Sequence, residues 1–240
     1  MNLQLPLSIS LRDDASFENY VCGANEQIVQ HLIRCVQGRD SDGAIYLWGN
    51  FGVGVSHLLH AACHAAGDKY ISAVYLPLAE LMEESTAIFE GLETISVVCI
   101  DDIESIAGNI EWETALFHLF NRIYDAGAQL IIGANCTVSQ LGLILPDLAS
   151  RLSWGFVYRL HDLKDEDKLM VLKTRAMARG LDLSDNVGHY LLKRYPRDMT
   201  QLYALLNELD VASLAAQRKL TIPFIKSWLD GSETTQQSLF

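Results

Sequence analysis

The chain has 240 residues, is 50% hydrophobic and carries a formal net charge of −12. That length allows one large core, or a domain with a smaller satellite. The acidic balance argues against a surface that holds DNA by neutralising its phosphates, so protein partners are the better expectation.

The N-terminal segment, the apolar runs and the cysteines indicate the cellular compartment of the protein. The N-terminus has no basic, apolar signal segment, and no apolar run is long enough to span a membrane. Five scattered cysteines without a CxxC pair favour reduced thiols over disulfides or zinc. These features predict a folded cytoplasmic protein without membrane contact.

From about residue 25 to residue 160, helical patterns alternate with short apolar runs. The helical patterns lie at about 25–37, 55–66, 78–90 and 111–126. The apolar runs are predicted to be buried strands, at 44–48, 72–76, 96–100, 129–134 and 156–160. Continuous apolar runs of this kind are typical of a parallel sheet covered on both faces. The predicted fold class is therefore α/β, a doubly wound domain over residues 16–160 with a five-stranded parallel sheet.

Beyond residue 161 the strand patterns stop and helical patterns follow. Acidic or polar starts at Asp165 and Ser184 and a glycine stop at Gly180 are ordinary capping signals. They predict a small all-α domain over residues 161–229, followed by a disordered tail at 230–240. Its long helix should bury one apolar stripe, made of Leu202, Leu205, Leu206, Leu209 and Leu214.

A glycine-rich loop, "GNFGVGVSH", joins the first predicted strand to the helix at 55–66. Its glycines allow a tight turn whose N–H groups can bind phosphate at the positive end of the helix. Val55 stands where such loops carry a lysine, and Ser56 stands where a hydroxyl binds Mg²⁺. The candidate nucleotide-binding residues are Gly49, Asn50, Phe51, Gly52, Val53, Gly54, Val55, Ser56 and His57. The spacing alone leaves open a glycine-rich turn that binds no ligand.

Polar residues follow two of the predicted strands. Asp101 could hold Mg²⁺ together with Ser56, and the adjacent Asp102 could orient a water molecule. Asn135 ends the next strand and could sense a γ-phosphate. The alternative is that the two acids merely cap the end of a strand.

Two arginines remain to be considered. Arg151 follows a short helical stretch and precedes the last predicted strand, and Arg197 starts the long helix of the second domain. Spacing alone assigns neither of them a role, because a lone arginine is most often solvated or salt-bridged.

Over residues 16–229 the chain resembles AAA+ proteins of the bacterial initiator clade, and its lid is most similar to Hda-like regulators of the initiator DnaA. The upstream box "SFENYVCGANEQIV" implies that Asn19, Tyr20 and Val21 contact the base and ribose. The other matching segments, in chain order, are "GNFGVGVS", "VVCIDD", "IIGAN", "ASRLSWG" and "RDM". Two departures matter: Val55 replaces the loop lysine, and the chain ends where a DNA-reading domain would begin. Autonomous ATP turnover and sequence-specific origin binding are therefore not expected.

The resemblance also implies a function. Hda-like regulators dock on the DNA-loaded sliding clamp, the beta subunit of DNA polymerase III, and stimulate hydrolysis of ATP held by DnaA. Arg151 would be the arginine finger acting in trans, Asn135 the first sensor, and Arg197 the lid residue that contacts the phosphates. The bound ligand would be an adenine nucleotide, ADP or another nucleoside diphosphate, with Mg²⁺ where the acids hold it.

The N-terminal "QLPLSI" resembles a clamp-binding peptide, in which a glutamine precedes apolar anchors in an extended segment. The implied anchors are Gln4, Leu5, Leu7 and Ile9. The C-terminal "QQSLF" has a similar pattern, so a second clamp-binding peptide stays open. Self-association of the chain also stays open. DNA would be reached only through the clamp.

Two other functions stay open at this point. One is an autonomous AAA+ ATPase, favoured by Asp101, Asp102 and Asn135. The other is a DNA-binding initiator paralogue that acts at the origin.

Overall fold

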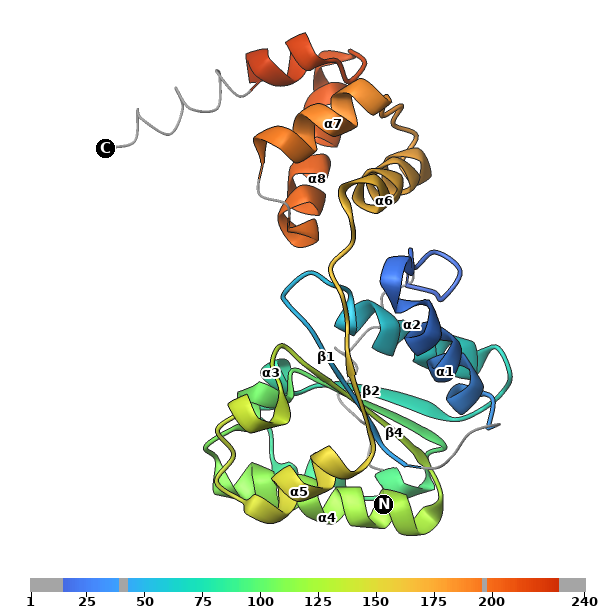
Figure 1. Cartoon of the computed structure of the whole chain (residues 1–240), viewed down its shortest axis with the longest axis vertical. Coiled ribbons are helices and arrows are strands. Elements are labelled where there is room, and N and C mark those ends of the chain that lie inside the picture. The colour runs from blue at the N-terminus through green and yellow to red at the C-terminus, as the bar shows by residue number, and fades with distance from the viewer. Residues whose placement is uncertain (1–14, 39–42, 196–197, 229–240) are drawn as a thin grey trace. The chain divides into compact units, whose positions relative to one another are not determined.

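The computed structural model describes residues 15–38, 43–195 and 198–228, which form two compact units, Met1–Asp162 and Leu163–Phe240 (Figure 1). Each unit has its own hydrophobic core. Within the described ranges, none of the helices has the length and apolar character needed to cross a membrane.

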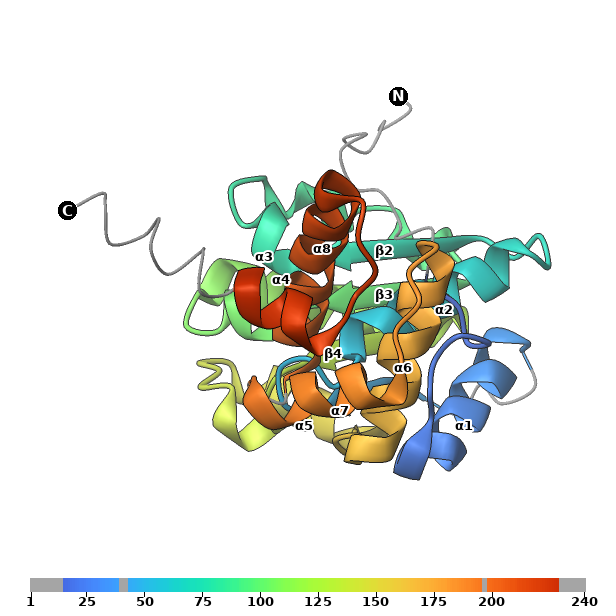
Figure 2. The ribbon, with the colours of Figure 1, turned by 90° about the horizontal axis from the view of Figure 1, so that it is seen from above.

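The first unit contains a five-stranded parallel sheet in the order β2-β3-β4-β1-β5. Figure 2 shows β2, β3 and β4 side by side in this order. The strands are β1 (Ile45–Trp48), β2 (Ala73–Pro77), β3 (Val97–Asp101), β4 (Gln129–Ala134) and β5 (Phe156–Arg159). The predicted α/β fold class with five parallel strands is confirmed.

Strand β5 is not buried as the sequence predicted. It lies at one edge of the sheet and pairs only with β1. Phe156 is 39% exposed and Val157 is 44% exposed. An edge strand has a neighbour on one side only, so an apolar run of this length does not by itself imply full burial.

The two faces of the sheet build two separate cores, because successive side chains of a strand point to opposite faces. On β3, Val98 and Ile100 enter one core, whereas Val97 and Cys99 enter the other. In Figure 1, α1 and α2 cover one face, and α4 and α5 cover the other. These helices are α1 (Glu26–Val36), α2 (Val55–Gly67), α4 (Ile110–Ala126) and α5 (Pro146–Trp154).

The helix predicted over 78–90 is broken into two short pieces. α3 covers only Leu78–Leu81, and a 3₁₀ turn follows at Thr86–Phe89. Between them Ser85 adopts an extended conformation, and its hydroxyl accepts a hydrogen bond from the N–H of Ala87. A serine side chain that bonds to the backbone in this way competes with helix continuation, which the apolar pattern did not reveal.

The second unit is all helical, with α6 (Asp165–Ala178), α7 (Asp185–Arg194), α8 (Met199–Ala216) and a further helix at 222–228. The predicted stripe of α8 holds for Leu202, Leu205, Leu206 and Leu209, all buried, but Leu214 is 70% exposed. Ser213 takes the inward position instead, four residues after Leu209, and its hydroxyl donates to the carbonyl of Arg218. Leu214 is one residue too far along for the 3.6-residue helical period.

Candidate functional site

The glycine-rich loop turns from β1 into α2 with two residues in the left-handed region, Gly52 (φ +82°) and Gly54 (φ +101°). Glycine adopts these values without the steric cost that a Cβ would bring. Gly49 is required for another reason, because a Cβ there would lie 2.6 Å from Cγ1 of Val53. The N–H of Gly49 also donates to the carbonyl of Ala134 on β4, at 3.3 Å, so the loop starts from a fixed point on the sheet.

The loop ends at the N-terminus of α2, a helix of 13 residues. The N–H of Leu58 donates to the carbonyl of Gly54, and the N–H groups before it have no carbonyl four residues back within the helix. Among the described residues, no side chain caps this helix end. Exposed amides at the positive end of a helix suit phosphate oxygens, so the loop fits a nucleotide phosphate group.

Tyr20 lies directly against this loop. Its hydroxyl donates to the carbonyl of Val53 at 3.2 Å, and its ring is so close to Gly54 that a Cβ there would lie 2.7 Å from Cε2. The same hydroxyl accepts a hydrogen bond from the side chain of Asn25 at 3.4 Å. The upstream box and the loop, more than 30 residues apart in sequence, are thus brought together.

One residue of the upstream box and one of the glycine-rich loop, Asn19 and His57, contact the backbone of Ser16. Asn19 caps a local turn, in which its side chain accepts from the N–H of Ser16 at 3.1 Å. Nε2 of His57 lies 3.0 Å from the carbonyl oxygen of Ser16, which joins the start of α2 to the same turn. Phe51 is 76% exposed at the tip of the loop, while Val21 and Ser56 are half-buried.

A buried asparagine, which no sequence pattern indicated, fixes the segment that follows β5. Asn25 is fully buried, and its side-chain amide forms two hydrogen bonds with the backbone of His161, one to the carbonyl (3.0 Å) and one from the N–H (2.8 Å). One residue later, Asp162 accepts from the side chain of Asn50 at 2.9 Å. The segment that leads out of the sheet is therefore tied to both the upstream box and the glycine-rich loop.

Asp101, the last residue of β3, is turned into the protein. It is 2% exposed, its Oδ2 accepts from the Tyr75 hydroxyl at 2.7 Å, and its Oδ1 accepts from the N–H of Asp102 at 3.0 Å. Burial and the neighbouring Asp101 carboxylate raise the pKa of Tyr75 far above its usual value, so this hydroxyl stays protonated and remains a donor. The Tyr75 ring stacks on His60 of α2 at 4.0 Å.

The surroundings of Asp101 also decide whether Mg²⁺ fits. A Cβ on Gly133 of β4 would lie 2.5 Å from Asp101 Oδ1, 2.8 Å from Val55 Cγ1 and 3.1 Å from Leu59 Cδ2, so this oxygen has two apolar side chains in its surroundings. Mg²⁺ requires octahedral oxygen ligands and keeps several waters. Within the described ranges, three or more His, Cys, Asp or Glu residues nowhere gather in a position to hold a metal ion. The residues present therefore do not fit a hydrated Mg²⁺ held by Asp101 and Ser56.

Asp102 and Asn135 lie at the same edge of the sheet, where β3 and β4 end. Burial, followed by the charges of Asp101 and Glu104, raises the pKa of Asp102 to about 6. The N–H of Asn135 donates to Glu104 at 3.4 Å, and the residue itself is exposed. An acid with a pKa near neutrality beside an exposed amide is an arrangement that can orient water.

Arg151 lies on α5, which packs on the face of the sheet opposite to α2. Its guanidinium lies over the ring of Trp154, 5.4 Å from the centroid, and that tryptophan is 59% exposed. The Tyr124 ring of α4 contacts Trp154 in turn, with centroids 5.1 Å apart. The arginine is thus held at the surface, on the other face from the helix that its own glycine-rich loop begins.

Several predicted residues lie outside the described part of the chain. They are the phosphate-contacting Arg197, the clamp anchors Gln4, Leu5, Leu7 and Ile9, and the C-terminal segment 236–240.

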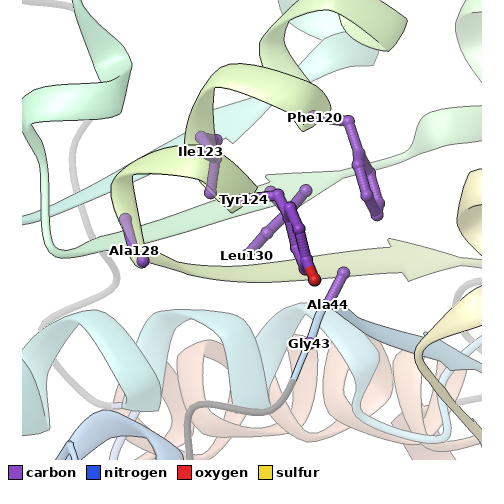
Figure 3. Close-up of a pocket in the computed structure, with 8 residues that line it drawn as sticks. Gly43, Ala44, Phe120, Ile123, Tyr124, Ala128 and Leu130 are labelled. Atoms are coloured by element: carbon purple, nitrogen blue, oxygen red, sulfur yellow. The ribbon is translucent and has the colours of Figure 1, made fainter.

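A small apolar pocket lies at the opposite end of the strands from the glycine-rich loop. Figure 3 shows Phe120 and Tyr124 projecting from α4 toward Ala44, which precedes β1. Its volume is about 50 Å³, far below the several hundred Å³ of a nucleotide-sized site. The pocket is therefore not the nucleotide site.

Comparison with known families agrees with this geometry. Residues 11–159 match the family model of the bacterial DnaA ATPase domain. The chain belongs to this family. Residues 165–229 match the model of the Hda lid domain. The protein is therefore an Hda-like AAA+ protein related to DnaA.

Solved structures of the DnaA family share the fold. Domain III of Thermotoga maritima DnaA superposes with a TM-score of 0.80 at 19% identity, covering 90% of this chain and 95% of that one. Aquifex aeolicus DnaA bound to AMPPCP gives 0.68 at 21% identity, covering 83% and 67%. A replication initiator DnaA bound to AMPPCP and single-stranded DNA gives 0.70 at 19% identity, covering 84% and 66%.

Proposed function

We propose that this chain is a negative regulator of replication initiation in the cytoplasm, which binds the sliding clamp and stimulates hydrolysis of the ATP held by DnaA. The observation that carries the proposal is the position of Arg151. It lies at the surface on α5, away from the helix that begins at its own glycine-rich loop, where a guanidinium can serve a nucleotide on another protein. The match to the Hda lid domain supports the same function.

The chain's own nucleotide would be a structural ligand. The loop offers backbone amides at the start of α2, and Val55 adds no positive charge beside them. Such a site can hold phosphate but is poorly equipped to stabilise charge on a phosphoryl group in transfer. DnaA structures bound to AMPPCP support an adenine nucleotide, and we propose ADP. Asn19, Tyr20 and Val21 would contact the base and ribose, and Arg197 the phosphates.

In this function Arg151 supplies what the chain's own loop lacks. A guanidinium placed at the transferring phosphoryl group of a partner can raise the rate by roughly 10³ to 10⁵. Stacking on Trp154 limits the conformations of the arginine before it meets the partner, which lowers the entropy lost on docking. Trp154 would therefore assist the arginine without touching the reacting atoms.

The test is to replace Arg151 with alanine and measure hydrolysis of ATP preloaded on DnaA, with the clamp loaded on DNA. We expect stimulation to fall by at least about 10²-fold, because the charge at the phosphoryl group is lost. Arg159 also stacks on a tryptophan, Trp48, at 5.2 Å, so Arg159→Ala is a matched control that should keep stimulation.

Binding measurements complete this test. Arg151→Ala should bind ADP and the clamp as the unmodified chain does, since Arg151 belongs neither to the glycine-rich loop nor to the proposed clamp-binding peptide. Undiminished stimulation by Arg151→Ala would refute the assignment. Loss of ADP or clamp binding in the same variant would assign the arginine a structural role instead.

A second candidate function, an autonomous ATPase, is favoured by Asp102, whose raised pKa suits a group that orients or activates water. Phosphate release by the purified chain alone, abolished in Asp102→Asn, would support it. A DNA-binding paralogue acting at the origin is opposed by the net charge of −12, and a salt-dependent binding assay with origin DNA tests it.

A further inference from the structure

Each carboxylate oxygen of Asp101 already accepts a hydrogen bond inside the protein. One oxygen accepts the Tyr75 hydroxyl and the other accepts the N–H of Asp102. Tyr75 comes from β2, the neighbouring strand, in which Pro77 is paired with Asp101. The bond therefore follows from the register of two paired strands and not from the conformation of a loop.

The second oxygen has apolar neighbours. A Cβ on Gly133 of β4 would meet Asp101 Oδ1, Val55 Cγ1 and Leu59 Cδ2 together, so this oxygen shares its surroundings with two apolar side chains. Releasing Asp101 for a metal would leave the hydroxyl of Tyr75 buried without its acceptor, which costs about 1–3 kcal/mol. The same change would also have to displace the stacked pair Tyr75 and His60.

We propose that the glycine-rich loop binds its nucleoside diphosphate as the metal-free anion, because Tyr75 has taken the carboxylate that a divalent ion would need. The proposal rests on the nucleotide-holding role and adds the ionic form of the ligand. Neither of the cations that usually help to bind the phosphates then contributes. Val55 stands in the position of the lysine, and the hydrogen bond from Tyr75 keeps Asp101 from holding a metal ion. Phosphate is held by backbone amides and by the positive end of α2.

The charges at this edge favour a diphosphate over a triphosphate. Asp102 and Glu104 lie beside Asp101, and no metal ion screens them. An additional phosphate brings more negative charge to an edge that is already acidic. The loop should therefore hold metal-free ADP more tightly than metal-free ATP.

The experiment measures the dissociation constant of ADP for the full-length chain by calorimetry, once in excess magnesium chloride and once in excess EDTA. We expect the two constants to agree within about threefold, which is well under the 1.4 kcal/mol of a tenfold change. Binding that is about tenfold tighter with magnesium would overturn the proposal. Absence of ADP binding in both buffers would instead refute the nucleotide holder itself, and the proposal with it.

Tyr75→Phe tests the cause. It removes the hydroxyl but keeps the ring stacked on His60, so Asp101 Oδ2 loses its partner and gains the freedom to bind an ion. We expect ADP binding by this variant to become tighter in magnesium than in EDTA by about tenfold. The same flat response as in the unmodified chain would show that Tyr75 is not the reason, and would overturn the proposal.

Two further variants guard against a folding defect. Tyr158→Phe also removes the hydroxyl of a strand tyrosine, one bonded to His31 Nδ1 at 3.0 Å, and should respond to magnesium as the unmodified chain does. Asp101→Asn keeps an acceptor for Tyr75, and its ADP dissociation constants in the two buffers should again agree within about threefold. Weaker binding of Asp101→Asn in magnesium alone would contradict the proposal even if Tyr75→Phe fails to fold.

Discussion

Asp102 is subject to two constraints at once. Its backbone is left-handed, with φ +55° and ψ +44°, and its half-buried carboxyl lies beside Asp101 and Glu104. Asparagine tolerates the left-handed region as well as aspartate does. An asparagine at this position keeps the backbone conformation and removes the charge.

Asp102→Asn should therefore stabilise the fold in a pH-dependent manner. The pKa of the folded-state carboxyl is about 6, against an ordinary value of 3.8, so the folded state loses stability as the pH rises between these values. The variant lacks this loss. Its gain in melting temperature should be largest at about pH 7.5 and shrink toward about pH 5.

Thermal unfolding followed by circular dichroism at the two pH values measures this difference. Glu83→Gln removes an exposed acid and serves as the control, with the same small effect at both. An equal shift of Asp102→Asn at both pH values would contradict the raised pKa.

At the residue scale, the sequence was informative wherever function depends on local spacing. The glycines of the loop could be predicted because the turn conformation requires them within a few residues. The Tyr75 bond to Asp101 and the Asn25 bonds to His161 could not, since their partners are 26 and 136 residues apart. Only the strand order brings these residues together.

At the element scale, a buried glutamate determines where α5 begins. Glu113 of α4 is fully buried, and its carboxylate accepts hydrogen bonds from the N–H groups of Gly108 (2.8 Å), Ile144 (3.1 Å) and Leu145 (2.7 Å). These bonds fix the segment that leads into α5, the helix that carries Arg151. The position of that arginine therefore depends on a side chain from a neighbouring helix.

Glu113→Ala should lower the free energy of unfolding by about 3 kcal/mol or more, because three buried N–H groups lose a charged acceptor. Urea denaturation measures the change. Glu111→Ala changes an exposed glutamate two residues earlier on the same helix; it is the matched control and should cost less than about 1 kcal/mol. If Glu113→Ala also lowered the free energy of unfolding by less than about 1 kcal/mol, α5 would be held by its apolar contacts alone.

Strands and long helices were predictable because they depend on hydrophobic periodicity. β1 to β4 and α4 lie close to their predicted ranges. The predicted helix over 78–90 failed because Ser85 bonds to the backbone, a local polar effect that periodicity does not register. The predicted burial of β5 failed because position within a sheet is not encoded in the strand itself.

At the scale of the whole molecule, the proposed function requires two attachments that do not share residues. In this proposal Arg151 would act on the partner initiator, and the N-terminal anchors would bind the clamp. The first lies on α5, and the second lies outside the described residues. Separate variants should therefore disable each attachment independently.

Replacing Gln4, Leu5 and Leu7 with alanine should reduce clamp binding by at least about tenfold, because the anchors of an extended peptide supply most of its affinity. ADP binding should not change. Surface plasmon resonance with immobilised clamp measures the first, and calorimetry the second.

Alanine at Leu239 and Phe240 tests whether "QQSLF" is a second foothold. Unchanged clamp binding would exclude it, and a loss comparable to that of the N-terminal variant would establish it. Full clamp binding after both replacements would contradict the assignment of either peptide.

The strand order has a consequence for the ribosome-bound chain. β1 pairs only with β4 and β5, so residues 45–48 emerge early and wait for partners made more than 80 residues later. The anchor of the glycine-rich loop, the bond from Gly49 to Ala134, cannot form before then. The glycine-rich loop therefore cannot complete its contact with β4 until that strand has left the exit tunnel, long after residues 45–48 have done so. A nucleotide bound as we propose would then be captured late in the synthesis of the first unit.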